Sequence, residues 1–153
     1  MPTLSEVYSK FGDAAEAAQL LETELDNILL SAAIDKHGFE KTKNKELAKK
    51  ILGEIDRKTL GQLIQELKKS GGPGEKLQDL LALALSERNR LNHSFYRQHN
   101  LRRDTEEGRV IMLADLEAIH ERLLAAYAAV LPLGGIEITE DAILKAQSGH
   151  LPL

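Results

Sequence analysis

The segment VYSKFGDAAEAAQLLETELDNILLSA, residues 7–32, repeats an apolar side chain at alternating steps of four and three residues. The repeating positions are Val7, Phe11, Ala14, Ala18, Leu21, Leu25, Ile28 and Ala32. On an α-helix this spacing forms one continuous apolar stripe, which is typical of the seam of a long packed helix. We therefore expect a helix from about Leu4 to Ile34, with Ser5 as its N-terminal cap.

Similar periodicity later in the chain predicts further helices. Two long ones are expected, from Glu75 to about Asn100 and from the cap Thr105 to about Val130. Shorter helices are expected over residues 45–55, 59–69 and 139–147, and SGGPG at residues 70–74 is the clearest break. No run alternates apolar and polar residues as a strand would.

These elements predict a single all-α domain over residues 1–153. The expected architecture is an antiparallel helical bundle with three long helices and two or three short ones. Its core covers about residues 4–131, and residues 132–153 form a short C-terminal helix and tail.

The composition excludes several classes of protein. The chain contains no cysteine, which rules out disulfides and thiolate chemistry. Apolar runs such as Leu80 to Leu85 are far shorter than the ~20 residues that cross a bilayer. The first residues, MPTLSEVYSK, lack the basic start and apolar run of a signal peptide. We therefore expect a cytoplasmic protein with no membrane partner.

Charge is distributed unevenly along the chain, whose net charge is −4. Residues 1–35 carry −6, residues 36–103 carry +8, and residues 104–153 carry −6. A basic middle between two acidic segments indicates either an anionic partner or pairing between the segments.

The segment ERNRLNHSFYRQH, residues 87–99, contains most of the chemistry in this basic middle. On a helical wheel, Arg88 falls within the stripe that Leu81, Ala84 and Leu91 define. A guanidinium there requires a carboxylate partner, because burying an unpaired charge is costly. Glu22, at the margin of the first helix's stripe, is the predicted partner, and a purely structural ion pair is one interpretation of Arg88.

A side face of the same helix belongs neither to the core stripe nor plainly to solvent. It consists of Leu85, Asn89, Asn92 and Tyr96, with His93 at its edge. Such a face suits a second helix, so we predict a two-fold homodimer with these four residues near the axis.

The segment from Arg88 to His93 resembles the signature of HEPN domains, which are small all-helical domains that carry an arginine, then four to six residues, then a histidine; here four residues lie between. A polar residue often follows the arginine, as Asn89 does here. The stretches AQLLE (18–22), TLGQLI (59–64) and EEGRVIML (106–113) are also similar to stretches in small bacterial members. The resemblance spans most of residues 4–131.

Many HEPN proteins are metal-independent endoribonucleases, often toxins, that work as dimers. The resemblance implies that Arg88, Asn89 and His93 are catalytic, and that the partners are a second copy, RNA and a protein antitoxin. Members paired with nucleotidyltransferase antitoxins often have a tyrosine two residues after the histidine. This chain has Phe95 there and Tyr96 one residue later, so control through modification of that tyrosine is not implied.

The residue types fit RNA cleavage without a metal. A histidine can take a proton from a 2′-hydroxyl and protonate a leaving oxygen, because its unperturbed pKa lies near neutrality. An arginine can stabilise the charge that develops on the phosphate. The expected contacts to the RNA backbone are Arg90, Arg97, His99, Arg102 and Arg103, and Tyr96 is expected to stack on a base. A solvated basic face that pairs with the acidic helices is the alternative interpretation.

No metal or cofactor is indicated. No two histidines stand four residues apart, and no acid cluster accompanies His37, His120 or His150. The alternative function is a non-catalytic dimeric helical module that binds RNA, nucleotide or a protein partner, in which Arg88 and His93 are structural.

Overall fold

The computed structural model describes residues 1–37, 46, 49–50, 53–54, 58–69 and 74–134. Its α-helices are α1 (Leu4–His37), α4 (Leu60–Lys69), α5 (Glu75–His93), α6 (Phe95–His99) and α7 (Glu106–Val130). Two 3₁₀ helices, η1 (Asn100–Asp104) and η2 (Leu131–Gly134), complete the described elements. No strand occurs among these residues, which confirms the predicted all-α class.

Two of the predicted short helices fall largely on residues outside that set. The helix expected over 139–147 lies wholly outside the described residues. Of the helix expected over 45–55, only residues 46, 49–50 and 53–54 are described, and these are helical.

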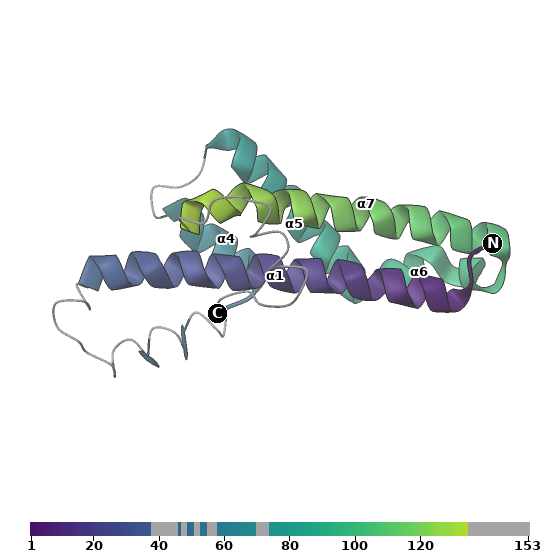
Figure 1. Ribbon diagram of the computed structural model, residues 1–153, viewed down its shortest axis with the longest axis horizontal. Coiled ribbons are helices and arrows are strands. Elements are labelled where there is room, and N and C mark those ends of the chain that lie inside the picture. Colours follow the sequence, from purple (N-terminus) through teal and green to yellow (C-terminus); the bar gives the residue numbers. More distant parts are fainter. Residues whose placement is uncertain (38–45, 47–48, 51–52, 55–57, 70–73, 135–153) are drawn as a thin grey trace.

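The three long helices α1, α5 and α7 form a bundle in which the chain runs up, down and up (Figure 1). Contacts fix these directions. In the first turn of α7, Arg109 donates to the carbonyl of Pro2, just before α1, at 2.8 Å, so α1 and α7 run in the same direction with their starts together. Phe11, early in α1, packs against Phe95, directly after the end of α5, with ring centroids 5.9 Å apart, so α5 runs against both. The predicted antiparallel bundle is therefore confirmed.

The apolar stripes predicted from spacing form the core. Buried positions of α1 include Val7, Ala14, Ala18, Leu21, Leu25 and Ile28, whereas Phe11 is half-buried. The stripe of α7 is buried throughout, at Met112, Leu116, Ile119, Leu123, Ala126 and Val130. Helix α4 buries Leu60, Leu63, Ile64 and Leu67. Because each large apolar side chain stabilises the fold by roughly 1.5–3 kcal/mol when buried, these stripes hold the bundle together.

The two predicted N-terminal caps have different outcomes. Thr105 caps α7 as expected, since its hydroxyl accepts a hydrogen bond from the backbone N–H of Gly108 at 3.0 Å. The prediction of Ser5 as the cap of α1 is wrong, because α1 already begins at Leu4. Thr3 takes that role, and its hydroxyl accepts from the N–H of Glu6 at 3.2 Å.

The single helix predicted from Glu75 to about Asn100 is interrupted, and that prediction is wrong. Helix α5 ends at His93, Ser94 adopts φ −143° and ψ −4°, and α6 resumes at Phe95. The Ser94 hydroxyl donates to the carbonyl of Arg90 at 3.4 Å, a local bond of the kind that competes with regular helix. At the far end of α6, Asn100 has a positive φ of 49°, and η1 follows.

Helix length and hydropathy also bear on membranes. In the part of the chain described above, no helix is both long and apolar enough to span a bilayer.

Candidate functional site

Arg88 is held by two neighbours. Its Nε donates to Oε1 of Glu22 on α1 at 3.2 Å, which confirms the predicted salt bridge, and the pair forms within one chain. Its Nη1 donates to Oδ1 of Asn89 at 3.3 Å. The Arg88 side chain keeps 22% of its surface exposed and Glu22 keeps 30%. The guanidinium is therefore oriented by the protein yet still reachable from solvent.

This exposure changes the expected energy of the pair. A fully buried pair broken on one side costs ~3–5 kcal/mol, whereas exposed pairs contribute ~0.2–1 kcal/mol. For a pair between these limits, we expect Glu22→Ala to lower the free energy of unfolding by about 1 kcal/mol. Urea denaturation would measure this loss. The control is Glu16→Ala, because Glu16 is exposed on the same helix. A loss above ~3 kcal/mol would show that assembly seals this pair from water.

His93 is the last residue of α5, directly before the break at Ser94. Its side chain is exposed, and its ring takes no part in a hydrogen bond or ion pair with the described residues. Its carbonyl accepts from Nη2 of Arg97 at 2.7 Å. Beside it lies an open hollow of about 300 Å³, lined by Phe11 and residues 91–97. The imidazole is therefore available to a ligand.

The exposed side of α5 is uncharged around this histidine. Ala82, Ser86, Asn89 and His93 are all exposed and follow one another at steps of four, three and four residues. They therefore share one face of the helix. Three of the four side chains are small or amide-bearing, so another helix could approach this face closely.

Two residues of the predicted dimer face are engaged within the chain. Leu85 is partly buried and packs beside α4, where a Cβ built on Gly61 would lie 3.7 Å from a Leu85 methyl. Tyr96 stacks on Phe11 with ring centroids 5.2 Å apart and meets Tyr8 edge-on at 6.2 Å. Asn89 and Asn92 remain exposed.

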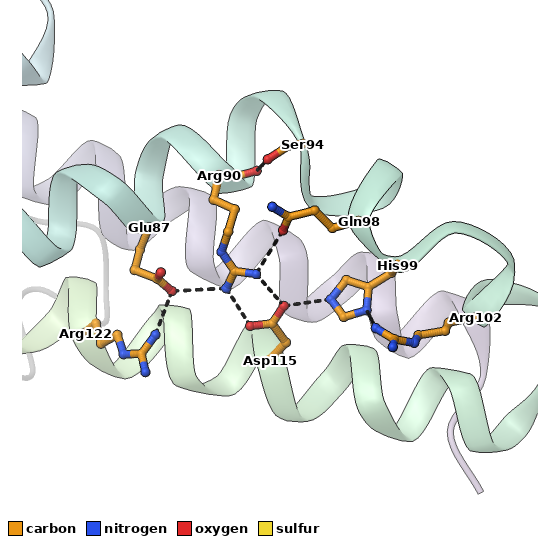
Figure 2. Close-up of polar contacts among 8 residues, drawn as sticks. All are labelled: Glu87, Arg90, Ser94, Gln98, His99, Arg102, Asp115 and Arg122. Atoms are coloured by element: carbon orange, nitrogen blue, oxygen red, sulfur yellow. Dashed lines mark hydrogen bonds and ion pairs between the residues drawn. The ribbon is translucent and has the colours of Figure 1, made fainter.

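Arg90 belongs to an internal network between α5, α6 and α7 (Figure 2). Its guanidinium donates to both carboxylate oxygens of Asp115 on α7, at 2.6 and 2.8 Å. It also reaches Gln98 of α6 at 3.1 Å and Glu87 at 3.3 Å. The hydrogen bonds to Asp115, donated by Arg90, lower the pKa of Asp115 and raise the pKa of Arg90. This ion pair therefore persists across the neutral range.

His99 joins the same network from the end of α6 (Figure 2). The ring is 5% exposed, and its Nε2 lies 2.7 Å from Oδ2 of Asp115. On the other side, Nη1 of Arg102 lies 3.0 Å from Nδ1 of His99. A carboxylate only accepts and a guanidinium only donates, so this geometry assigns the ring proton to Nε2.

These contacts engage three residues of the predicted RNA-binding set within the chain. Arg90 and His99 were expected at the phosphate backbone, but both are committed to Asp115, and His99 is buried. Tyr96 was expected to stack on a base, but Phe11 and Tyr8 already contact its ring. We do not carry these three residues into the proposed RNA surface.

The other predicted arginines stay accessible. Arg97, Arg102 and Arg103 are exposed, and within the described ranges none forms an ion pair with a carboxylate. Arg103 donates to the Tyr8 hydroxyl at 3.0 Å, which places it at the end of the bundle where α1 begins.

Asp115 and Glu87 were missed by sequence reasoning. Glu87 is 6% exposed and pairs with Arg90 and with Arg122 of α7 at 3.0 Å (Figure 2). One signal for Asp115 was present: it adjoins Leu116 beside the apolar stripe of α7, where an acid needs a partner. Nothing in the spacing indicated which partner.

Two further findings concern metal binding and similarity to known proteins. Among the residues that the structure describes, no group of three or more histidine or acidic side chains is arranged to hold a metal ion. No family model matches the chain, and neither a curated protein nor a solved structure matches it. The resemblance to HEPN domains therefore rests on the residues of this chain alone.

Proposed function

We propose that this chain is a dimeric, metal-independent endoribonuclease of HEPN type. The observation that carries the proposal is the placement of His93. Its imidazole is exposed at the end of α5 without a hydrogen-bond or ion-pair partner among the described residues, five residues after an arginine that Glu22 and Asn89 orient. A free imidazole beside a fixed guanidinium suits proton transfer at a phosphate.

The reaction follows from these groups. The 2′-oxygen of RNA attacks the adjacent phosphorus, and the bond from phosphorus to the 5′-oxygen breaks. His93 takes the 2′-hydroxyl proton as the general base, and His93 of a second copy protonates the leaving 5′-oxygen. Arg88 stabilises the charge on the non-bridging oxygens, and Asn89 orients the scissile group. The products are a 2′,3′-cyclic phosphate and a 5′-hydroxyl.

A dimer supplies the second histidine. The α5 face of Ala82, Ser86, Asn89 and His93 is uncharged and exposed. A two-fold axis on this face makes a self-complementary contact and brings the two His93 rings together. The short side chains let the two α5 helices approach closely.

The exposed arginines fit the substrate. Arg97 lies in α6, and Arg102 and Arg103 lie in η1. These exposed arginines therefore follow His93 in the chain, from the α5–α6 break to the end of the bundle. We assign them to the phosphate backbone of RNA. In this proposal the protein acts in the cytoplasm as a toxin, and a protein antitoxin restrains it.

Disrupting the α5 face tests assembly and activity together. We expect Ala82→Arg to give a monomer by light scattering and to lose cleavage of mixed RNA in EDTA, because a charged side chain blocks close approach. Ala114→Arg is the matched control, since Ala114 is exposed on α7. It should stay dimeric and active. Cleavage by monomeric Ala82→Arg would refute a site shared between two copies, and a wild type without activity in EDTA would refute the nuclease.

One observation favours a second candidate, a non-catalytic helical module that binds RNA, nucleotide or a protein partner. The in-chain pair between Arg88 and Glu22 is also what a purely structural arginine makes. In that case the wild type would bind RNA in a gel-shift assay without cleaving it.

A further inference from the structure

Asp115 contacts both sides of the helix break that presents His93. On α5, Arg90 lies three residues before His93 and donates to Asp115 at 2.6 and 2.8 Å. On α6, His99 lies six residues after His93 and meets Asp115 at 2.7 Å. One carboxylate on α7 thus ties together the ends of two helices that diverge at Ser94 (Figure 2).

Further bonds around Asp115 make this arrangement rigid. Gln98 of α6 accepts from the same Arg90 guanidinium at 3.1 Å, so a direct link also joins the helices across the break. The carbonyl of Arg90 accepts from the backbone N–H of Ser94 at 3.0 Å, so the helical hydrogen bonding of α5 extends to its C-cap at Ser94. The Asp115 and Arg90 side chains are only 21% and 24% exposed. Charged hydrogen bonds of this length are strong when they are partly shielded from water.

His93, by contrast, has no side-chain hydrogen bond, ion pair or ring contact with the described residues to fix it. Where its imidazole lies relative to Arg88 therefore depends on how α5 ends. Both helices at that end are held by α7 through one side chain.

We propose that Asp115 is the positioning residue of the nuclease site, which sets the direction of His93 by clamping α5 and α6 across the Ser94 break. This inference rests on the proposed function. Asp115 contacts protein groups in the network, so it acts on proton transfer through geometry and leaves RNA binding unchanged.

Steady-state kinetics separates a role in positioning His93, which affects kcat, from a role in RNA binding, which affects KM. For Asp115→Asn, which keeps the shape but loses the charge and one acceptor oxygen, we expect kcat for RNA cleavage in EDTA to fall by about 10- to 100-fold. The KM should stay within about two-fold of wild type, because a group that only orients the reacting residue contributes little to ground-state binding. Asp115→Glu should recover part of kcat, because its carboxylate can still bind Arg90.

Glu117→Gln is the matched control. It makes the same change of charge on the same helix, but Glu117 is 66% exposed and pairs with Lys10 of α1. It should leave kcat unchanged, which separates positioning from any general effect of negative charge on RNA. Hydrogen exchange supplies a readout independent of activity: residues 94–104 should exchange faster in Asp115→Asn than in Glu117→Gln.

The outcomes are distinct. A wild type that does not cleave RNA overturns the proposed function, and the positioning role with it. An active wild type with an unchanged kcat in folded Asp115→Asn overturns the positioning role alone. If Asp115→Asn does not fold by circular dichroism, His99→Leu replaces it, because this variant removes the contact between α6 and Asp115 and keeps the pair of Asp115 with Arg90. Wild-type kcat in folded His99→Leu together with unchanged exchange at residues 94–104 would then overturn the positioning role.

Discussion

Replacing His93 with alanine is expected to lower kcat for RNA cleavage in EDTA by about 10²- to 10⁴-fold, the usual contribution of a general acid or base. In the proposed dimer both proton transfers use this residue, so one substitution removes the base and the acid together. The His93 side chain is exposed at the end of α5, so the change opens no cavity. The free energy of unfolding and the dimer should therefore be close to wild type.

His120→Ala is the control for this experiment. His120 lies on α7, and its Nδ1 is 3.0 Å from the Lys10 Nζ, remote in the chain from the α5–α6 break. The control variant should keep wild-type kcat. Full activity in His93→Ala would show that His93 is neither acid nor base, and the enzyme proposal would then lose the residue on which it rests.

Gly108→Ala is expected to destabilise the protein, although alanine is normally the better helix former. In the first turn of α7, a Cβ on this residue would overlap the carbonyl oxygen of Arg102 and lie 2.6 Å from its Cα. Those are backbone atoms of η1, so relief requires moving η1 away from α7. Overpacking of this kind costs about 1–3 kcal/mol or more, which exceeds the ~1 kcal/mol that alanine gains over glycine in a helix.

Gly12→Ala tests the same substitution without the collision. Gly12 lies within α1, and a Cβ there would meet nothing within 4 Å. Helix propensity alone then acts, so thermal unfolding should show a gain of up to ~1 kcal/mol. A destabilised Gly108→Ala beside a stabilised Gly12→Ala would establish the close packing of η1 on α7. Gains in both variants would contradict it.

Local spacing was enough to predict the bundle and one of its ion pairs. The stripes of α1 and α7 were predicted residue by residue, because helical period and apolar burial act through near neighbours in the chain. The Glu22–Arg88 bridge was predicted because a charge inside a stripe requires a partner on the facing helix. Its burial was overestimated, since a wheel gives a direction and does not show how far a long side chain extends toward solvent.

The amino-acid sequence by itself determined which faces of the long helices are buried, and hence the all-α class. Only the tertiary structure decided which polar groups meet in the Asp115 network. Asp115 pairs with Arg90, 25 residues earlier in the chain, and with His99, 16 residues earlier. The spacing of Arg90 and His99 had predicted that both would contact RNA. The physical reason is range: periodicity reports burial within one helix, whereas a charged pair depends on how two helices are placed against each other. The tertiary structure also decided the break at Ser94. The chain leaves the helical path there, and side chains on both sides of it bind α7.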